Sequence, residues 1–229
     1  MTPMEIEALS LSLQVAAWAV IASVPLAVPV AWVLARRSFP GKTLLDGIVH
    51  LPLVLPPVVT GYVLLVVLGR NGAVGSALES IGLTFAFDWK GAAVASAVMS
   101  FPLLVRAARI SMEAVDPALE AAASTLGAGP ARIFLRVTLP LSLPGVLAGS
   151  ILAFARSLGE FGATITFVSN IPGQTRTLPL AIYTLTQVPG GDAGAMRLCA
   201  ISIAVSLLAL LGSELLGRRL TERLGRASP

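Results

Sequence analysis

Long runs of apolar residues dominate the chain, and short polar stretches separate them. A run of about 18 or more apolar residues with few charges predicts a helix that crosses a membrane. The pattern predicts five such helices, over residues 9–35, 47–69, 91–110, 141–158 and 195–216. We therefore expect an all-α membrane protein with five transmembrane helices, forming a single domain over residues 1–229.

The second of these helices is interrupted by Pro52, Pro56 and Pro57. A membrane helix tolerates proline where neighbouring groups satisfy the freed carbonyls, and a helix broken in this way often lines a cavity. A different interruption follows the fourth helix. The segment from Glu160 to Tyr183 is too broken for a full span and too apolar for a free loop, so it predicts a re-entrant or outer-gate element.

Composition agrees with a membrane protein. The chain is 55% hydrophobic and 12% charged, with a mean hydropathy of +0.86, whereas soluble domains carry about 25% charged residues. Basic residues lie between the apolar runs and form no basic face, which argues against nucleic-acid binding. Cys199 is the only cysteine, which excludes an internal disulfide and a cysteine-built metal site. We expect no catalytic residue, no metal and no cofactor.

The distribution of basic residues predicts the orientation. With the N-terminus in the periplasm and the C-terminus in the cytoplasm, eleven basic residues face the cytoplasm and at most five lie outside or at the boundary, as the positive-inside rule requires. The cytoplasmic set is Arg36, Arg37, Lys42, Arg106, Arg109, Arg132, Arg136, Arg218, Arg219, Arg223 and Arg226; the other is Arg70, Lys90, Arg156, Arg176 and Arg197. Glu5 and Glu7 precede the first helix where a secretory signal would be basic, so we expect a retained helix.

Residues 113–140 form the most polar loop on the expected cytoplasmic side. Asp116 followed by Pro117 predicts a helix N-cap with proline at the first helical position. Gly127 is placed to end that helix in a left-handed conformation. Pro130 can then open a second short helix, which we expect to end at Leu139-Pro140. Two short helices joined by a glycine turn would form a protruding surface to which another protein could bind.

The same residues carry a family resemblance. Glu120-Ala121-Ala122, Gly127 and Val137-Thr138-Leu139-Pro140 resemble the EAA loop of binding-protein-dependent ABC-importer permeases. One departure is that Glu120 lies one residue early, so that Ala121 takes the glutamate position. The stretches SLGEFGATITFVSN and TLPLAIY resemble the molybdate-type branch of this family. Permeases for sulfate and tungstate share much of that pattern.

The resemblance implies a permease subunit of the inner membrane that works as a homodimer in contact with lipid. It implies cytoplasmic ATP-binding subunits and a periplasmic molybdate-binding protein as partners. ATP-driven closure would move the coupling loop and rock the spans between inward- and outward-facing states. The chain itself would perform no bond chemistry.

Candidate functional residues fall into two groups. The resemblance assigns Glu120, Ala121, Ala122, Gly127, Leu139 and Pro140 to the ATPase-coupling loop, and Arg132 and Arg136 are further candidates on its second helix. Arg132 and Arg136 would either pair with carboxylates of the ATPase or face solvent or lipid headgroups. Arg156 and Glu160, four residues apart, predict a local ion pair, with an oxyanion-attracting Arg156 as the alternative. Together with Thr164 they are the candidate pathway or gate residues.

Other patterns favour plainer interpretations. Gly41-Lys42-Thr43 matches the end of a P-loop, but Arg36 replaces the first glycine and no strand precedes it. His50 has only Asp46 as a titratable neighbour in sequence, which favours a packing role. A gated channel would not need a cytoplasmic surface for binding another protein. An intramembrane enzyme would need paired polar groups inside the spans.

Overall fold

The computed structural model describes residues 2–225, with the backbone alone at 213, 214 and 216–225. Within this part of the chain every regular element is helical, which confirms the all-α prediction. The elements are α1 (Pro3–Arg36), α2 (Lys42–Val54), α3 (Pro57–Leu68), α4 (Gly75–Glu79), α5 (Trp89–Glu113), α6 (Pro117–Thr125), α7 (Pro130–Ile133), the π-helical turn η1 (Phe134–Thr138), α8 (Leu139–Leu158), α9 (Gly162–Val168), α10 (Leu178–Thr186) and α11 (Asp192–Gly225).

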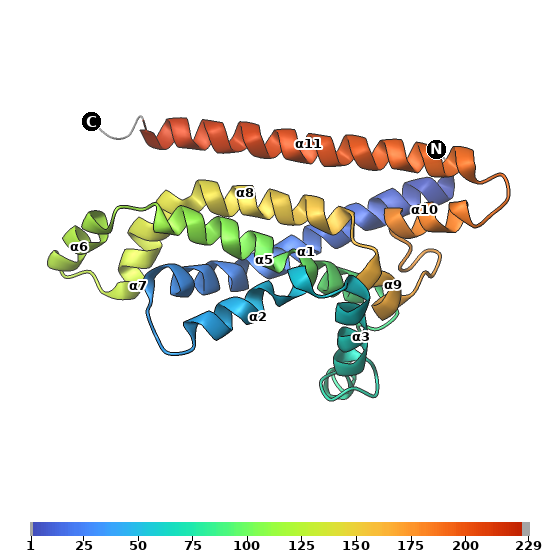
Figure 1. Ribbon diagram of the computed structural model, residues 1–229, viewed down its shortest axis with the longest axis horizontal. Helices are drawn as coiled ribbons and strands as arrows, with labels where there is room; N and C mark the ends of the chain where they lie inside the picture. Colours follow the sequence, from blue (N-terminus) through green and yellow to red (C-terminus); the bar gives the residue numbers. More distant parts are fainter. Residues whose placement is uncertain (1, 226–229) are drawn as a thin grey trace.

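Helix α5 is the centre of the bundle. It makes its most extensive contacts with α1 and α8, and α11 packs on the other side of α8 (Figure 1). The first half of α5 is rich in small buried residues, including Gly91, Ala92, Ala95 and Ser96. Small residues let membrane helices approach closely, because lipid gives no hydrophobic drive for helix association. These small residues therefore let α5 approach its neighbours closely.

Four helices are long and apolar enough to cross a membrane: α1, the continuous helix 130–158, α5, and α11 as far as Gly212. The pair α2 and α3 is a fifth candidate, but its two halves bend by 113°. The bend follows from Pro56 and Pro57, because a residue before proline is pushed out of the helical region. Leu55 and Pro56 accordingly have ψ angles of 141° and 132°. The expected span 47–69 is thus two helices.

One expected boundary is wrong. The second helix of the coupling loop does not end at Leu139-Pro140 but continues into α8. Pro140 cannot donate a backbone hydrogen bond, and its ring would crowd the carbonyl four residues earlier. The wider η1 turn accommodates this, with the Leu139 N–H bonded to the Phe134 carbonyl five residues back. A proline that usually stops a helix instead lies just after a π-helical turn.

The two ends of the molecule differ. The helices α6 and α7 and the end of α11 lie at one end, and the start of α1 lies at the other with α10 (Figure 1). At this second end Arg197 pairs with Glu5, 2.7 Å apart, and Arg176 contacts Met4. Several basic residues expected on opposite sides of the membrane therefore lie at opposite ends. The side chains of Arg218, Arg219, Arg223 and Arg226 are outside the described residues.

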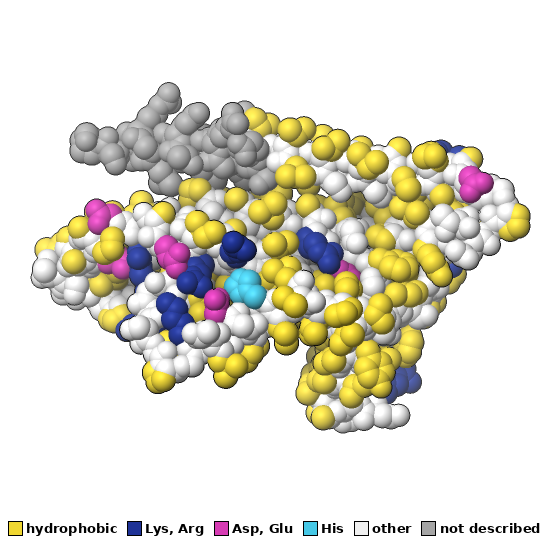
Figure 2. Space-filling view, in the orientation of Figure 1, with side chains coloured by type: hydrophobic (Ala, Val, Ile, Leu, Met, Phe, Trp, Pro, Cys, Tyr) yellow, Lys and Arg dark blue, Asp and Glu magenta, His cyan; other side chains and the backbone are white. Residues whose placement is uncertain are grey.

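The surface is that of a protein that faces lipid or other apolar partners. Hydrophobic side chains cover most of the face shown in Figure 2, and charged ones gather toward the α6–α7 end and beside α2. Along α3, the side chains of Val58, Tyr62, Val63 and Val66 are each at least half exposed. A soluble monomer rarely exposes so many large apolar side chains along one helix.

Candidate functional site

The first half of the coupling loop folds as the sequence predicts. The Asp116 carboxylate caps α6 by accepting a hydrogen bond from the Ala118 N–H at 2.8 Å. Gly127 has φ = +82°, in the left-handed region. Its N–H donates to the Ser124 carbonyl, and the Ala128 N–H donates to the Ala123 carbonyl. This is the Schellman pattern, which satisfies the last carbonyls of a helix.

Helix α6 and the turn after it form a protruding knob, residues 116–129. None of the residues of α6 is buried. Leu126 is 88% exposed and Leu119 is 49% exposed, an unusual position for large apolar side chains unless a partner covers them. Ala121 and Ala122 are also exposed, as are Arg132 and Arg136 on the following turns. The knob thus offers an apolar tip, and two exposed cationic side chains follow it in the chain.

Glu120 behaves differently from the rest of the knob, because it faces the body of the protein. Its Oε1 accepts hydrogen bonds from Arg36 Nε at 3.1 Å and from Thr138 Oγ1 at 2.6 Å. Arg36 Nη2 also donates to the Val115 carbonyl at 2.8 Å. Arg36 is the first charge after the first apolar run, and that position was the only sequence signal for its role.

The turn η1 joins the knob to the bundle. The ring of Phe134 lies 5.2 Å from that of Trp32 on α1, and the Arg37 guanidinium lies 5.2 Å from the same indole. Thr138 is fully buried and Leu139 partly buried, whereas Pro140 is exposed. Leu139 and Pro140, expected as the end of the coupling loop, therefore form the start of a span.

The second candidate site lies where α8 ends. Arg156 Nη1 is 2.9 Å from Glu160 Oε2, so the expected ion pair is confirmed. Glu160 Oε1 accepts a hydrogen bond from the Ala163 N–H at 2.9 Å, at the start of α9. The Glu160 side chain is 1% exposed and that of Arg156 is 32% exposed. One carboxylate thus ties the end of α8 to the start of α9.

Thr164 lies one turn further along, on α9. It is buried, and its hydroxyl has no hydrogen-bond partner among the described residues. Helix α9 packs closely on α3, since a Cβ added to Gly61 would lie 2.5 Å from the Ala163 carbonyl oxygen. The proline-broken span and the candidate gate residues are therefore neighbours, a relationship that the sequence did not indicate.

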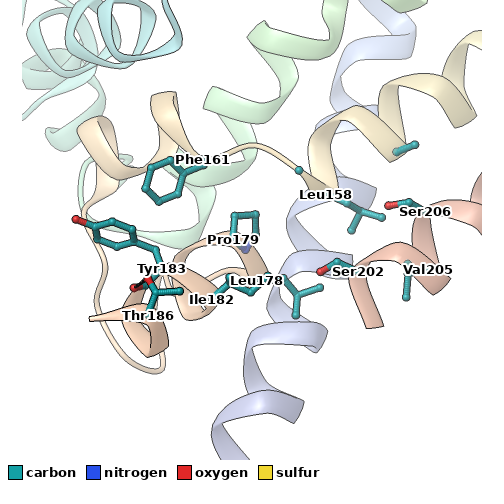
Figure 3. Close-up of a pocket in the computed structure, with 12 residues that line it drawn as sticks. Leu158, Phe161, Leu178, Pro179, Ile182, Tyr183, Thr186, Ser202, Val205 and Ser206 are labelled. Carbon is teal, nitrogen blue, oxygen red and sulfur yellow. Dashed lines mark hydrogen bonds between the residues drawn. The ribbon is translucent and has the colours of Figure 1, made fainter. Parts of the chain in front are cut away.

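A cavity of about 470 Å³ opens beside the irregular segment that follows α8 (Figure 3). Its walls come from the end of α8, from α10 and from α11. The rings of Phe161 and Tyr183 contact each other at one side, with centroids 5.3 Å apart and planes tilted by 52°. Ser202 and Ser206 of α11 point in from the other side. The irregular backbone at Gly159–Phe161 thus lines a cavity, as expected at membrane depth.

A charged cluster joins α2 to α5. Arg109 lies 3.2 Å from Asp46 and 2.8 Å from Glu113, and His50 Nδ1 is 2.9 Å from the Asp46 carbonyl oxygen. Arg109 on α5 thus faces Asp46 on α2, a contact that the sequence did not indicate. In the part of the chain that the structure describes, no three His, Cys, Asp or Glu side chains are placed to hold a metal ion.

Residues 24–222 match the family described as binding-protein-dependent transport system inner membrane component. This chain belongs to that family. It is therefore a multi-pass protein of the inner membrane and the transport component of such a system, not its ATPase. The prediction of a permease of the binding-protein-dependent importer family is confirmed.

Several relatives are similar over most or nearly all of the chain. The chain is 60% identical over 227 residues to the molybdenum transport system permease protein ModB of Escherichia coli strain K12, covering 99% of each chain. It is 58% identical to the protein of the same name in Haemophilus influenzae, over 98% of this chain and 99% of that one. It is 39% identical to the sulfate transport system permease protein CysT of Salmonella typhimurium, over 84% of this chain and 69% of that relative.

Solved structures support the fold. The crystal structure of a bacterial ABC transporter involved in the import of the acidic polysaccharide alginate matches with a TM-score of 0.75 at 20% identity, over 96% of this chain and 81% of that chain. The inward-facing MetNI methionine ABC transporter matches with a TM-score of 0.67 at 14% identity, over 94% of both chains. The expected likeness to importer permeases is confirmed at the level of the fold.

Proposed function

We propose that this chain is the membrane-spanning permease subunit of an ATP-driven importer of molybdate. The observation that carries the proposal is the 60% identity over 99% of both chains to a molybdenum permease. The 227 matched residues span both candidate sites, residues 116–140 and 156–164. The chain would provide the passage and the coupling surface, and a separate subunit would hydrolyse ATP.

The working assembly would contain two copies of this chain with the pathway between them. Cytoplasmic ATP-binding subunits would dock on one side and a periplasmic molybdate-binding protein on the other. The exposed apolar side chains of α3 are compatible with a second copy or with lipid as the covering partner. This assembly needs the N-terminus in the periplasm and the C-terminus in the cytoplasm, which the separation of the two ends supports.

The knob would be the surface to which the ATPase binds. Leu119 and Leu126 are exposed apolar side chains that a groove on a partner could bury. Arg132 and Arg136 are exposed on the turns that follow the knob and could pair with carboxylates at the rim of such a groove. Exposed charge pairs add specificity more than affinity, so the apolar tip would supply most of the binding energy.

The pathway would carry the anion without holding it tightly. Arg156 is the cation among the candidate gate residues, and Glu160 neutralises it. A compensated cation attracts a tetrahedral dianion less strongly than a free one, which suits rapid passage. Thr164, buried one turn away with its hydroxyl unpaired, would complete the gate.

Sulfate is the second candidate substrate, because the chain is also 39% identical to a sulfate permease. Tungstate has the same tetrahedral geometry and charge as molybdate and would be a third. Deleting the gene for this chain separates these possibilities. We expect lower molybdoenzyme activity at low external molybdate, restored by abundant molybdate, and normal growth on sulfate as sole sulfur source. Loss of growth on sulfate with normal molybdoenzyme activity would favour the sulfate alternative.

A further inference from the structure

The Glu120 carboxylate lies where three helical segments meet. It belongs to α6, it pairs with Arg36 at the end of α1, and it accepts a hydrogen bond from Thr138 in η1. Arg36 and Glu120 are 84 residues apart in sequence. The Glu120 side chain therefore links the knob to α1 and to η1, the turn that leads into α8.

The side chains that make the contacts of Glu120 are largely shielded from water. The side chains of Arg36 and Glu120 are only 17% and 20% exposed, and Thr138 is fully buried. Hydrogen bonds to charged groups are about twice as strong as neutral ones, and partial burial limits their competition with water. Arg36 also bonds the Val115 carbonyl just before α6. Its position in the last turn of α1 adds a favourable interaction with the helix dipole.

Thr138, which donates a hydrogen bond to Glu120, lies in the π-helical turn η1. Such turns are less stable than the α-helix and often mark functional positions within a helix. The tilted aromatic contact between Trp32 and Phe134 joins the same turn to α1 a second time. The start of α8 is thus fastened to α1 by one polar and one aromatic contact, both within the cytoplasm-facing end proposed above.

We propose that Glu120 is a positioning residue that transmits movement of the knob to α1 and α8, and that it is not a contact to the ATPase. Its carboxylate faces inward, whereas the large apolar residues of the knob face outward. A knob displaced by a partner would pull α1 through Arg36 and α8 through Thr138. This inference rests on the proposed function, since it assumes that a partner moves the knob.

The test uses the full transporter in proteoliposomes with its ATPase and binding protein. The variants are Glu120→Gln, Arg36→Gln and Thr138→Val, each of which removes one group of the link. Thr138→Ser keeps the hydroxyl and serves as the conservative variant. Glu79→Gln is the matched control, because Glu79 is more exposed and its nearest cation, Arg70, is 3.7 Å away. Three quantities are measured: inserted protein, co-purified ATPase, and ATP hydrolysed per anion transported.

We expect all variants to insert and to co-purify the ATPase as the wild type does. The ATP hydrolysed per anion should rise roughly three- to tenfold in the first three variants, and stay at the wild-type value in Thr138→Ser and Glu79→Gln. The double variant Glu120→Gln/Arg36→Gln should be no worse than either single one, because both remove the same contact.

Two results would overturn the proposal. Loss of ATPase binding in Glu120→Gln alone would make Glu120 a direct contact to the ATPase. A wild-type ratio in all three variants, or failure of all three to insert, would leave the link without a role in coupling. The substrate is a separate question, since the ratio can be measured with whichever oxyanion the wild-type complex transports.

Discussion

The guanidinium of Arg156 lies 2.9 Å from the carboxylate of Glu160, whose side chain is 1% exposed. The pair is asymmetric, because Arg156 keeps a third of its side chain exposed and Glu160 does not. Removing Arg156 would leave a buried carboxylate without its cation, and breaking a buried pair costs about 3–5 kcal/mol. The exposure of Arg156 reduces this toward the lower end.

Arg156→Gln should therefore destabilise the protein more than Glu160→Gln, which leaves a cation that can reach water and keeps an oxygen for the Ala163 N–H. Thermal unfolding of the purified protein in detergent checks the order. The exposed Arg70 provides the control, because Arg70→Gln should shift the unfolding temperature little. Equal shifts for Arg156→Gln and Glu160→Gln would contradict the asymmetry.

Gly127 and Gly129 allow a matched test of the knob. A Cβ added at either position meets no atom within 4 Å, but only Gly127 has a positive φ, +82°. Alanine at Gly127 should thus cost about 1–2 kcal/mol of backbone strain, while alanine at Gly129 should cost little. We expect Gly127→Ala to insert normally and to weaken ATPase co-purification, with Gly127→Val worse.

Gly129→Ala should co-purify the ATPase as the wild type does. Normal ATPase binding and full transport by Gly127→Val would show that residues 116–129 are not the coupling surface. Weak binding in both alanine variants would mean that the turn is sensitive to bulk and not to the left-handed backbone.

The contact between α3 and α9 gives a third prediction. A Cβ at Gly61 would lie 2.5 Å from the Ala163 carbonyl oxygen, whereas one at Gly47 meets nothing within 4 Å. Overpacking of this kind costs about 1–3 kcal/mol. Gly61→Ala should lower the unfolding temperature and disturb the position of Thr164, seen as reduced transport, and Gly47→Ala should change neither. Wild-type stability of Gly61→Ala would contradict the close packing.

Sequence patterns predicted what depends on neighbours in the chain. The apolar runs predicted the long helices, Asp116 and Gly127 predicted the ends of α6, and the spacing of Arg156 and Glu160 predicted their pairing. Contacts between distant segments were not predictable. The link from Arg36 to Glu120 and the pair of Arg109 with Asp46 join residues 84 and 63 positions apart, and periodicity carries no information about such pairs.

Proline also misled the sequence interpretation in one place and not in another. Pro56 and Pro57 bend the chain by 113°, while Pro140 leaves the helix continuous because η1 absorbs its missing hydrogen bond. The outcome depends on how neighbouring turns relax, which a local proline rule does not describe.

Membrane topology is the fourth prediction. Reporters fused after Phe39 and at the C-terminus should indicate cytoplasm, and one after Gly72 should indicate periplasm. A reporter after Gly72 in the cytoplasm would mean that α2 and α3 turn back without crossing. A periplasmic C-terminus would mean an even number of spans and contradict the five-span arrangement.

The most direct measurement of the central claim is uptake of radioactive molybdate by proteoliposomes that contain this chain, its ATPase and its binding protein. We expect uptake that requires ATP, stops when the binding protein is left out, and is reduced more by unlabelled tungstate than by an equal concentration of sulfate. Uptake of labelled sulfate in preference to molybdate would contradict the proposed substrate, and molybdate flux without ATP would contradict an ATP-driven importer.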